Sequence, residues 1–228
     1  MSLRFRPMPG LTAVTLLILP LLVGLGVWQY QRWQWKTGVL AEIDAAVSAP
    51  PLQGLDALAD ATGPLDFRRI QFDGEATGDT FLLYRPSGNI AWMPVRVVET
   101  DRQRALVGFP TIQRTEADIE VVPTMDGTRA GYVRRIRDRT GAARLFGVSD
   151  NPQANRWYGV NPDGAWLPGA DLYIDASLDS RDADALPVRR PDVPNNHVSY
   201  MLTWWSFAVI WLIIYAVLHR RAGRLGRA

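Results

Sequence analysis

Residues Pro194–Leu218 read PNNHVSYMLTWWSFAVIWLIIYAVL, and this segment indicates what kind of protein the chain forms. Its first residues are polar, but no residue from Val198 to Leu218 carries a formal charge. At a rise of about 1.5 Å per residue, a helix of this length crosses a hydrocarbon core of about 30 Å. Arginines follow at positions 220, 221, 224 and 227. We therefore predict a membrane-spanning helix with His197 at one mouth and a basic cluster at the other.

A second apolar segment lies near the start of the chain. No residue between Arg6 and Arg32 carries a formal charge, and Leu11–Tyr30 predicts another spanning helix. The alternative is a cleaved signal peptide, with removal near Ala46–Ala49. The apolar run is longer than the core of a usual signal peptide, and no small-x-small cleavage site follows it closely, so a retained span is favoured.

The helical pattern continues beyond this span. Leu40, Ile43 and Val47 recur at helical spacing, so we expect the helix to leave the membrane and to end at about Ser48. Pro50-Pro51 follows and stops it.

Arginines mark the same side of both spans. Arg4 and Arg6 precede the first span, four arginines follow the second, and neither tail has an acidic residue. The positive-inside rule therefore predicts that both termini are cytoplasmic. Without the six tail arginines, 19 of the 25 basic residues remain against 23 acidic ones, so the isoelectric point of 9.1 reflects the tails and predicts no nucleic-acid partner.

The preference for arginine over lysine also indicates what kind of organism makes the protein. Lys36 is the only lysine, which is typical of a GC-rich genome, and the residues before Leu11 are too few for a mitochondrial transit peptide. We predict a multi-pass protein of the bacterial inner (cytoplasmic) membrane, with the lipid bilayer as a partner and the main domain in the periplasm.

The middle of the chain predicts short strands separated by turn signals. The expected strands are Arg68–Phe72, Thr80–Tyr84, Trp92–Val98, Arg104–Phe109, Ile119–Val122, Gly131–Arg137 and Leu172–Ala176. Their spacing indicates a mainly antiparallel sheet that forms a small barrel or a sandwich. The segment Asn151–Gly169 predicts a loop with a short helix, and Ser180–Pro194 an extended return to the membrane.

These observations give an α+β membrane protein in which two transmembrane helices flank a β-rich outer domain. The expected layout is a cytoplasmic tail (1–10), transmembrane helix 1 (11–31), a helical extension at the outer interface (32–49), a periplasmic β-rich domain (50–194), transmembrane helix 2 (195–218) and a basic cytoplasmic tail (219–228).

The sequence contains no recognisable catalytic set. Cysteine is absent, which excludes disulfides and thiolate chemistry, and no nucleophile elbow, zinc-protease, phosphate-loop or dinucleotide motif is present. We expect His219 to belong to the basic end of the second span. The acidic stretch Asp171, Asp175, Asp179, Asp182 and Asp184 predicts a solvated face, with a docking patch as the alternative. We therefore expect no enzymatic activity.

Two interpretations of His197 remain open. On a helix its face is shared by Tyr200, Met201, Trp204, Trp211 and Tyr215. In the first interpretation this is a polar helix start, capped by Asn195 or Asn196, with aromatic side chains at the interface or packed on the first span. In the second, the imidazole is a haem ligand and the aromatic side chains bury the macrocycle.

Other residues complete this second interpretation. Met201 is one turn from His197, and axial ligands lie on opposite faces of the ring, so a second ligand would come from elsewhere or the iron would stay open. Arg32 and Lys36 lie at the same membrane face, where they either pair with haem propionates or anchor the first helix at the interface.

Three segments of the chain resemble the surfeit locus protein 1 (Shy1-type) family. They are Leu25-Gly26-Val27-Trp28-Gln29 with Arg32 and Trp35-Lys36, Asn155-Arg156-Trp157-Tyr158, and Pro194-Asn195-Asn196-His197 with Tyr200 and Thr203-Trp204. The last is the most specific. The usual Asn-Arg-Gly-Trp-Val-Pro strand of the family is matched only by Val107-Gly108-Phe109-Pro110, without its arginine and tryptophan.

The resemblance implies an assembly factor for haem–copper terminal oxidases, chiefly cytochrome c oxidase, that binds haem a and assists its insertion into the catalytic subunit. It implies His197 as the ligand of the haem iron, and the catalytic subunit and the haem a synthase as partners. With the residue-based interpretation, the binding site would comprise His197, Tyr200, Met201, Trp204, Arg32 and Lys36. The alternative is a structural scaffold or accessory subunit of the oxidase with no haem of its own.

Overall fold

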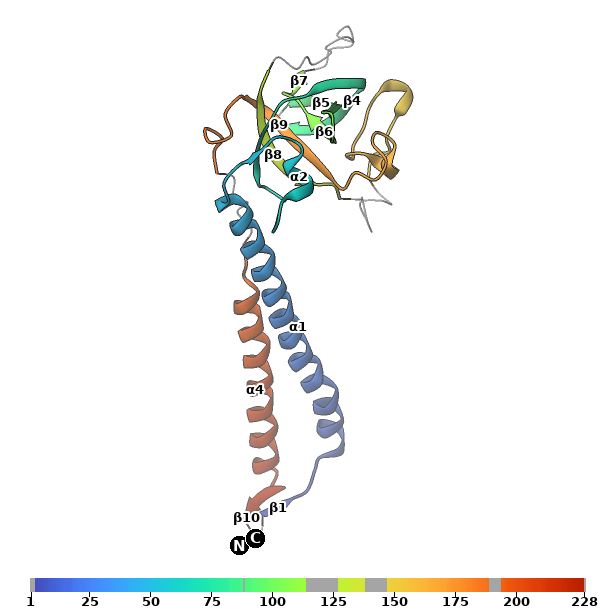
Figure 1. The fold of residues 1–228 in the computed structure, drawn as a ribbon. Coiled ribbons are helices and arrows are strands. Elements are labelled where there is room, and N and C mark those ends of the chain that lie inside the picture. The colour runs from blue at the N-terminus through green and yellow to red at the C-terminus, as the bar shows by residue number, and fades with distance from the viewer. Residues whose placement is uncertain (1–2, 88, 114–126, 138–146, 189–193, 228) are drawn as a thin grey trace. The chain divides into compact units, whose positions relative to one another are not determined.

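The computed structural model of the chain describes residues 3–87, 89–113, 127–137, 147–188 and 194–227. The chain separates into two compact units, which Figure 1 shows as ribbons. We call Met1–Ala41 with Pro191–Ala228 the helical unit, and Glu42–Arg190 the sheet domain. Each unit is described by itself.

Two long helices form most of the helical unit and run side by side (Figure 1). Helix α1 spans Pro9–Ser48 and helix α4 spans His197–Arg221. Both are long and apolar enough to cross a membrane, with mean hydropathies of 2.3 and 2.0 over their most apolar windows, and few residues of these windows are buried. The chain is therefore a membrane protein, and the predicted helix at each end is confirmed.

The helices meet along a seam of side chains at steps of three or four residues. Apart from Val198, the positions of α4 that are not exposed are His197, Met201, Trp204, Ala208, Trp211, Tyr215 and His219. Hydrogen bonds cross the seam from Trp211 Nε1 to Thr15 Oγ1 at 3.1 Å and between Thr12 Oγ1 and the Tyr215 hydroxyl at 2.8 Å. In the hydrocarbon core of a membrane, lipid tails are as apolar as the side chains of a neighbouring helix, so no hydrophobic force drives two helices together. Interhelical hydrogen bonds and close packing at small residues hold them together instead.

A short ribbon joins the ends of the helical unit. Strand β1, Leu3–Phe5, pairs antiparallel with β10, Leu225–Arg227, so the two termini lie together (Figure 1).

Within the described residues the sheet domain has eight strands, in the order β2-β3-β8-β9-β6-β5-β4, with β7 paired to β5. Their bounds are β2 Leu52–Gln53, β3 Arg69–Phe72, β4 Glu75–Ser87, β5 Asn89–Glu99, β6 Arg104–Gly108, β7 Ile112–Gln113, β8 Arg129–Arg135 and β9 Leu172–Ser180. Most pairs are antiparallel, as predicted, but β2–β3 and β6–β9 are parallel, so the sheet is mixed.

The strands that the sequence predicts are present wherever the structure describes them, and the strand expected at Ile119–Val122 lies outside the described residues. Short helices occupy the connections: α2 at Ala57–Asp60, and the 3₁₀ turns η1 at Pro152–Ala154 and η2 at Pro162–Gly164. The two 3₁₀ turns fall within the predicted loop Asn151–Gly169.

Apolar residues cover both faces of the central strands. One core cluster contains Val98, Val107 and Ile174, and a second contains Val97, Leu106 and Tyr173. Successive residues of a strand point to opposite faces, so strands that are buried on both sides need an apolar residue at nearly every position. The last turns of α1 belong to this domain, where Ala46 and Val47 are buried.

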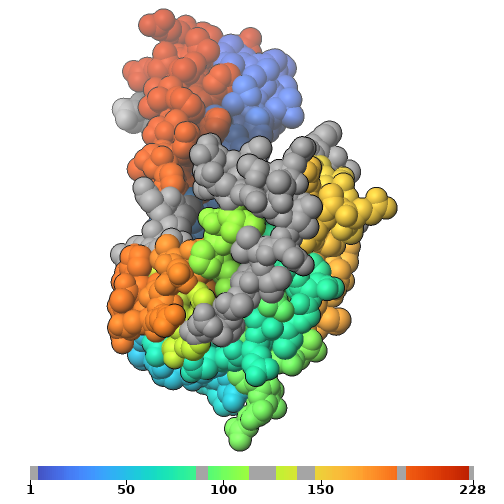
Figure 2. Space-filling model, turned by 90° about the horizontal axis from the view of Figure 1, so that it is seen from above, coloured from blue at the N-terminus to red at the C-terminus, as the bar shows by residue number. Residues whose placement is uncertain are grey.

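The segment between β8 and β9 covers the second cluster. Trp166 stacks on Phe81 with ring centroids 4.7 Å apart, and Trp157 meets Trp166 edge to face at 5.4 Å. The Trp157 carbonyl accepts a hydrogen bond from the Tyr84 amide at 2.7 Å, which ties the segment to β4. In Figure 2 this gold-coloured segment lies against the green strands of the sheet.

Candidate functional site

His197 is the first residue of α4 and is half-buried in the helical unit. Its Nδ1 lies 2.7 Å from Oε1 of Gln29 on α1. An amide oxygen only accepts hydrogen bonds, so Nδ1 is the donor, and when the ring carries one proton its lone pair is on Nε2. Within the described residues Nε2 has no hydrogen-bond partner. This is the form of histidine that binds a metal through one nitrogen while its other N–H is held by the protein.

A second contact brings the same ends of the two helices together. Lys36 Nζ donates a hydrogen bond to the carbonyl of Pro194, just before α4 begins. Gln29 and Lys36 are seven residues apart on α1, so they lie on one face about two turns from each other. A proline disfavours a helical conformation of the residue before it, so a helix does not readily extend back through Pro194. Helix α4 therefore starts close to the side chains of Gln29 and Lys36.

The predicted side-chain cap of α4 is wrong. Asn196 is the N-cap residue, but its side chain accepts no capping hydrogen bond, and Oδ1 of Asn195 is buried without a partner in the part of the chain that the structure describes. Only the carbonyl of Asn196 is used, by the Tyr200 amide at 3.3 Å.

The aromatic and thioether residues that follow His197 lie on different sides of α4. Met201 and Trp204 are half-buried on the seam, and Trp204 meets Phe207 edge to face at 6.2 Å. Tyr200 is 55% exposed, so it lies outside the seam. The structure therefore places Met201 and Trp204 on the same face as His197, and Tyr200 beside it.

The two cations of the predicted site have different surroundings. The Arg32 guanidinium lies 4.0 Å from the ring centre of Trp35 and is exposed, and no carboxylate contacts it within the described residues. Lys36 is half-buried and uses one of its three donors on Pro194. Both belong to the same end of the helical unit as His197.

Further along the seam the helices are in close contact. Trp205 packs on Gly26, where an added Cβ would lie only 2.1 Å from the indole Nε1. A flat macrocycle has no room between the helices at that level.

His219 at the other end of α4 is fully buried, with 0% of its surface exposed. Its Nδ1 donates to the Tyr215 carbonyl at 2.9 Å, its Nε2 accepts from the Met8 amide at 3.1 Å, and its ring packs on Phe5. His219 lies in the last turn of α4 with Arg220 and Arg221, as predicted, and it also joins the N-terminal segment to α4 through the Met8 amide. Both nitrogens are occupied, so His219 has no free ligand atom.

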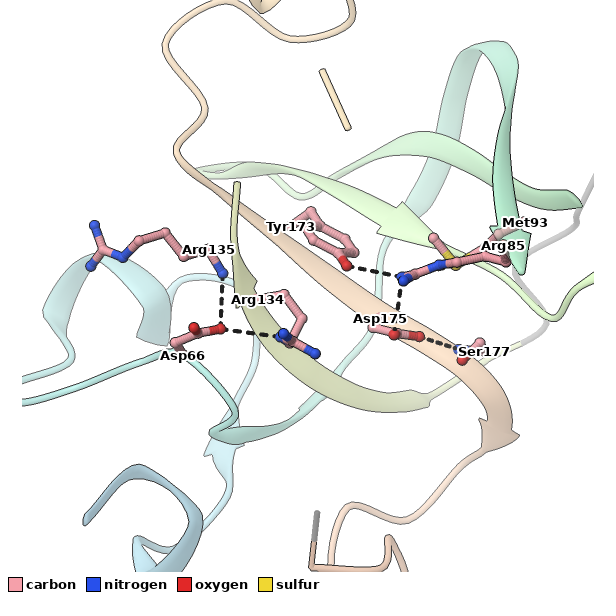
Figure 3. Close-up of polar contacts among 8 residues, drawn as sticks. All are labelled: Asp66, Arg85, Met93, Arg134, Arg135, Tyr173, Asp175 and Ser177. Carbon is pink, nitrogen blue, oxygen red and sulfur yellow. Dashed lines mark hydrogen bonds and ion pairs between the residues drawn. The ribbon is translucent and has the colours of Figure 1, made fainter. Parts of the chain in front are cut away.

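The sheet domain contains a separate polar network, drawn in Figure 3. Arg85 Nη2 donates to the Tyr173 hydroxyl at 2.9 Å and to Asp175 Oδ2 at 3.3 Å. Asp175 is only 8% exposed, so the predicted solvated acidic face is wrong for this residue. It is an ion-pair partner in the core. Asp179 and Asp184 pair with Arg129 and Arg69.

A second carboxylate, Asp66, contacts residues at the end of β8, and Figure 3 shows its contacts with Arg134 and Arg135. Asp66 accepts from Arg134 Nε and from the Arg135 amide, both at 3.1 Å, and from Arg137 Nη2 at 3.2 Å. A cavity of about 250 Å³ lies nearby, lined by Arg85, Arg134, Arg135, Arg137, Tyr84, Tyr158 and other residues. Asp66 and Asp175 form ion pairs with three of these arginines, Arg134, Arg137 and Arg85, so the network ties neighbouring segments of the sheet domain together.

Sequence reasoning missed Gln29 as a part of the site. The signal was available only in part: Gln29 is a polar residue at the end of the apolar run of α1, but Gln31 and Gln34 follow it and are equally polar. What the sequence did not indicate is that this face of α1 meets the first residue of α4. No group of three or more His, Asp or Glu side chains arranged to hold a metal occurs among the described residues.

Comparison with known proteins adds independent information. A model of the SURF1 family matches residues 16–209 of the chain. The chain is 27% identical over 217 residues to the mouse protein named Surfeit locus protein 1, covering 80% of this chain and 67% of the mouse protein. It is 26% identical over 233 residues to a SURF1-like protein of Monosiga brevicollis, covering 88% and 84%. A SURF1-like protein of Rickettsia conorii is 24% identical over 220 residues, covering 88% of each chain.

Proposed function

Because this chain belongs to the SURF1 family, we propose that it is an assembly factor for a haem–copper terminal oxidase, cytochrome c oxidase, that binds haem a through His197 and assists its insertion into the catalytic subunit. The observation that carries the proposal is the imidazole of His197. It has one nitrogen held by Gln29 and the other without a hydrogen-bond partner in the described residues, at the start of an apolar helix.

The residues around His197 fit a haem. When bound, haem a supplies an iron that takes axial ligands and a flat apolar ring with two propionates. His197 Nε2 is the nitrogen available for the iron. Met201 and Trp204 offer apolar surface next to it, Tyr200 presents an aromatic ring at the edge of this surface, and Arg32 and Lys36 offer positive charge for carboxylates.

The same residues favour release. Met201 lies one turn from His197 on the same helix, so it would pack beside the imidazole and would not serve as a second ligand. A single protein ligand suits a carrier that hands its cargo on, because a closed site with two ligands would have to break both bonds. The close contact of Gly26 and Trp205 also favours binding at the mouth of the helical unit over binding deeper between the helices.

The proposed location of the protein in the cell rests on the arginines at the ends of the two spans, as the proposed topology does. We place the protein in a bacterial inner membrane, with both termini in the cytoplasm and the sheet domain in the periplasm, because arginines flank the cytoplasmic ends of both spans. His197 then lies at the periplasmic face. The catalytic subunit of the oxidase and the haem a synthase are the proposed partners.

The test is the visible absorption spectrum of the full-length protein, purified gently from cells that also make haem a. We expect a haem band in the parent protein and its loss in His197→Ala. The chain offers a matched control, because it contains only one other histidine. His219→Gln removes that imidazole but keeps an oxygen that can accept the Met8 N–H, and we expect it to retain the band.

The outcomes separate the carrier from the scaffold. If neither the parent nor any variant has a haem band, and the catalytic subunit still co-purifies, the protein is a scaffold or accessory subunit and the haem proposal is wrong. If His219→Gln loses the band and His197→Ala keeps it, the site has been assigned to the wrong end of α4.

A further inference from the structure

We infer that Gln29 is the positioning residue of the haem site: its amide oxygen keeps the proton of His197 on Nδ1, and so keeps the lone pair on Nε2. This inference rests on the proposed function for the identity of the ligand that Nε2 binds. The contact itself, 2.7 Å between His197 Nδ1 and Gln29 Oε1, joins the two helices of the helical unit.

A neutral imidazole has one N–H, and the hydrogen bond made by one nitrogen decides the state of the other. Without an acceptor at Nδ1, a free imidazole favours the proton on Nε2, which leaves no lone pair there for a metal. Since Gln29 is the only hydrogen-bond partner of the His197 ring within the described residues, it is the residue that selects the binding-competent form.

The hydrogen bond also fixes the direction of the ring. His197 is at the first position of α4, where its own helix supplies no preceding turn to pack against the side chain. The Gln29 side chain comes from the other helix, so the direction of Nε2 depends on the pairing of α1 with α4. A contact that loosens this pairing would therefore also release the ligand.

The neutrality of the acceptor matters for release. Metal-binding histidines often donate their second N–H to a carboxylate, which raises the basicity of the ligand. An amide oxygen accepts the same hydrogen bond with weaker polarisation of the ring. Gln29 thus directs His197 to the iron without making it as strong a ligand as a carboxylate would, which fits a protein that hands haem on.

The first test needs no haem. The two imidazoles of the full-length protein, labelled with ¹⁵N-histidine in lipid nanodiscs, give two sets of ring nitrogen signals. We expect the His197 signals of the parent to report a proton on Nδ1, and those of Gln29→Leu to shift towards a proton on Nε2. His219 is an internal reference, because its nitrogens are held by the Tyr215 carbonyl and the Met8 amide in both proteins.

The second test uses haem itself. Titration of the haem-free protein with haem a, followed in the Soret region, should show binding that is about 10- to 100-fold weaker in Gln29→Leu. Gln29→Glu should bind haem a at least as tightly as the parent protein does, because the carboxylate polarises the imidazole ring more strongly. For the same reason, the reduction potential of the bound haem should be lower than in the parent. Gln31→Leu is the matched control, since Gln31 is the same residue type on the same helix with an exposed side chain, and should change neither quantity.

Failure of this inference is distinguishable from failure of the proposed function. If the parent binds haem through His197, but Gln29→Leu keeps its affinity, reduction potential and ¹⁵N signals, Gln29 has no positioning role. If the ¹⁵N signals shift as expected but no variant binds haem, Gln29 does position the ring and the proposed ligand is wrong. A Gln29→Leu protein that fails to fold leaves Gln29→Glu as the decisive variant, and an unchanged affinity and potential there would contradict the inference.

Discussion

Trp205 of α4 lies directly on the backbone of α1 at Gly26. A Cβ at position 26 would be 2.1 Å from the indole Nε1 and 2.3 Å from Cδ1, closer than any real contact between carbon and these atoms. The pairing of the two helices therefore depends on the absence of a side chain at this one position, which is how small residues act in membrane helices.

Gly26→Ala should separate the helices or displace the Trp205 ring. We expect a loss of about 1–3 kcal/mol in the free energy of unfolding, the usual cost of overpacking a closely packed site. Gly24→Ala is the control, because nothing lies within 4 Å of a Cβ there. Unfolding of the purified protein by titration with denaturing detergent measures both variants, and equal stabilities would show that the contact is not required.

Thr15→Val should weaken the same pairing by a different route. The Thr15 hydroxyl accepts from Trp211 Nε1 at 3.1 Å and donates to the Leu11 carbonyl at 2.8 Å, so valine leaves the indole N–H without its partner. The expected loss is about 0.6 kcal/mol and at most about 1.7, as for other hydrogen bonds between membrane helices.

Thr15→Ser should restore this stability, because it keeps the hydroxyl. Thr203→Val is the control, since the Thr203 hydroxyl is exposed and its hydrogen bond within the described residues is to the Ser199 carbonyl of its own helix. A double-mutant cycle with Trp211→Phe isolates the pair, and a coupling energy near zero would contradict the prediction.

Asp175→Asn should destabilise the sheet domain. Arg85 has 34% of its side chain exposed but Asp175 only 9%, so removal of the charge leaves a partly buried guanidinium with the Tyr173 hydroxyl but without its ion-pair partner. We expect a loss of about 1–3 kcal/mol, below the full cost of breaking a buried pair because solvent reaches Arg85. Thermal unfolding of the full chain, followed by near-ultraviolet circular dichroism, checks this.

The control for this pair is Glu99→Gln. Glu99 and Arg104 form an ion pair at 3.4 Å with 43% and 58% of their side chains exposed, and such surface pairs contribute little. Its unfolding temperature should therefore match that of the parent within error. A Glu99→Gln effect as large as that of Asp175→Asn would mean that burial does not set the strength of these pairs.

His219→Phe should release the chain ends from α4. Phenylalanine can still stack on Phe5 and Tyr215, but the Met8 amide loses its acceptor. We expect faster hydrogen exchange at the Met8 amide and a loss of about 1 kcal/mol in the free energy of unfolding, the low end of the cost of an unsatisfied donor, because this hydrogen bond is only partly buried. Arg220→Gln, at an exposed neighbouring position, should leave this exchange rate unchanged.

The elements of the fold were predictable from local patterns, because a membrane helix and a buried strand each require a particular kind of segment. The uncharged runs in Leu11–Tyr30 and Val198–Leu218 lie in α1 and α4, and the β-branched and aromatic runs lie in the strands. The spacing of Leu40, Ile43 and Val47 matched the end of α1 at Ser48.

The pairings between distant segments were not predictable in this way. Nothing in Arg104–Gly108 indicates that its neighbour is Leu172–Ser180, or that the pair is parallel. For the same reason the sequence indicated neither the Gln29–His197 contact nor the burial of His219. Asp175 was misassigned because a charged residue within an acidic stretch resembles a solvated one until its partner, Arg85, is known.

Among the described residues, strand β9 comes after the other strands of the sheet along the chain, yet it lies between β8 and β6. It joins two halves of the sheet, β2-β3-β8 on one side and β6-β5-β4 on the other, that share no strand pairing with each other in the described residues. During synthesis, both halves therefore present an open edge until residues 172–180 emerge. The domain completes its sheet only shortly before the ribosome begins α4, so a chain that stops before β9 has exposed strand edges and a single span to hold it in the membrane.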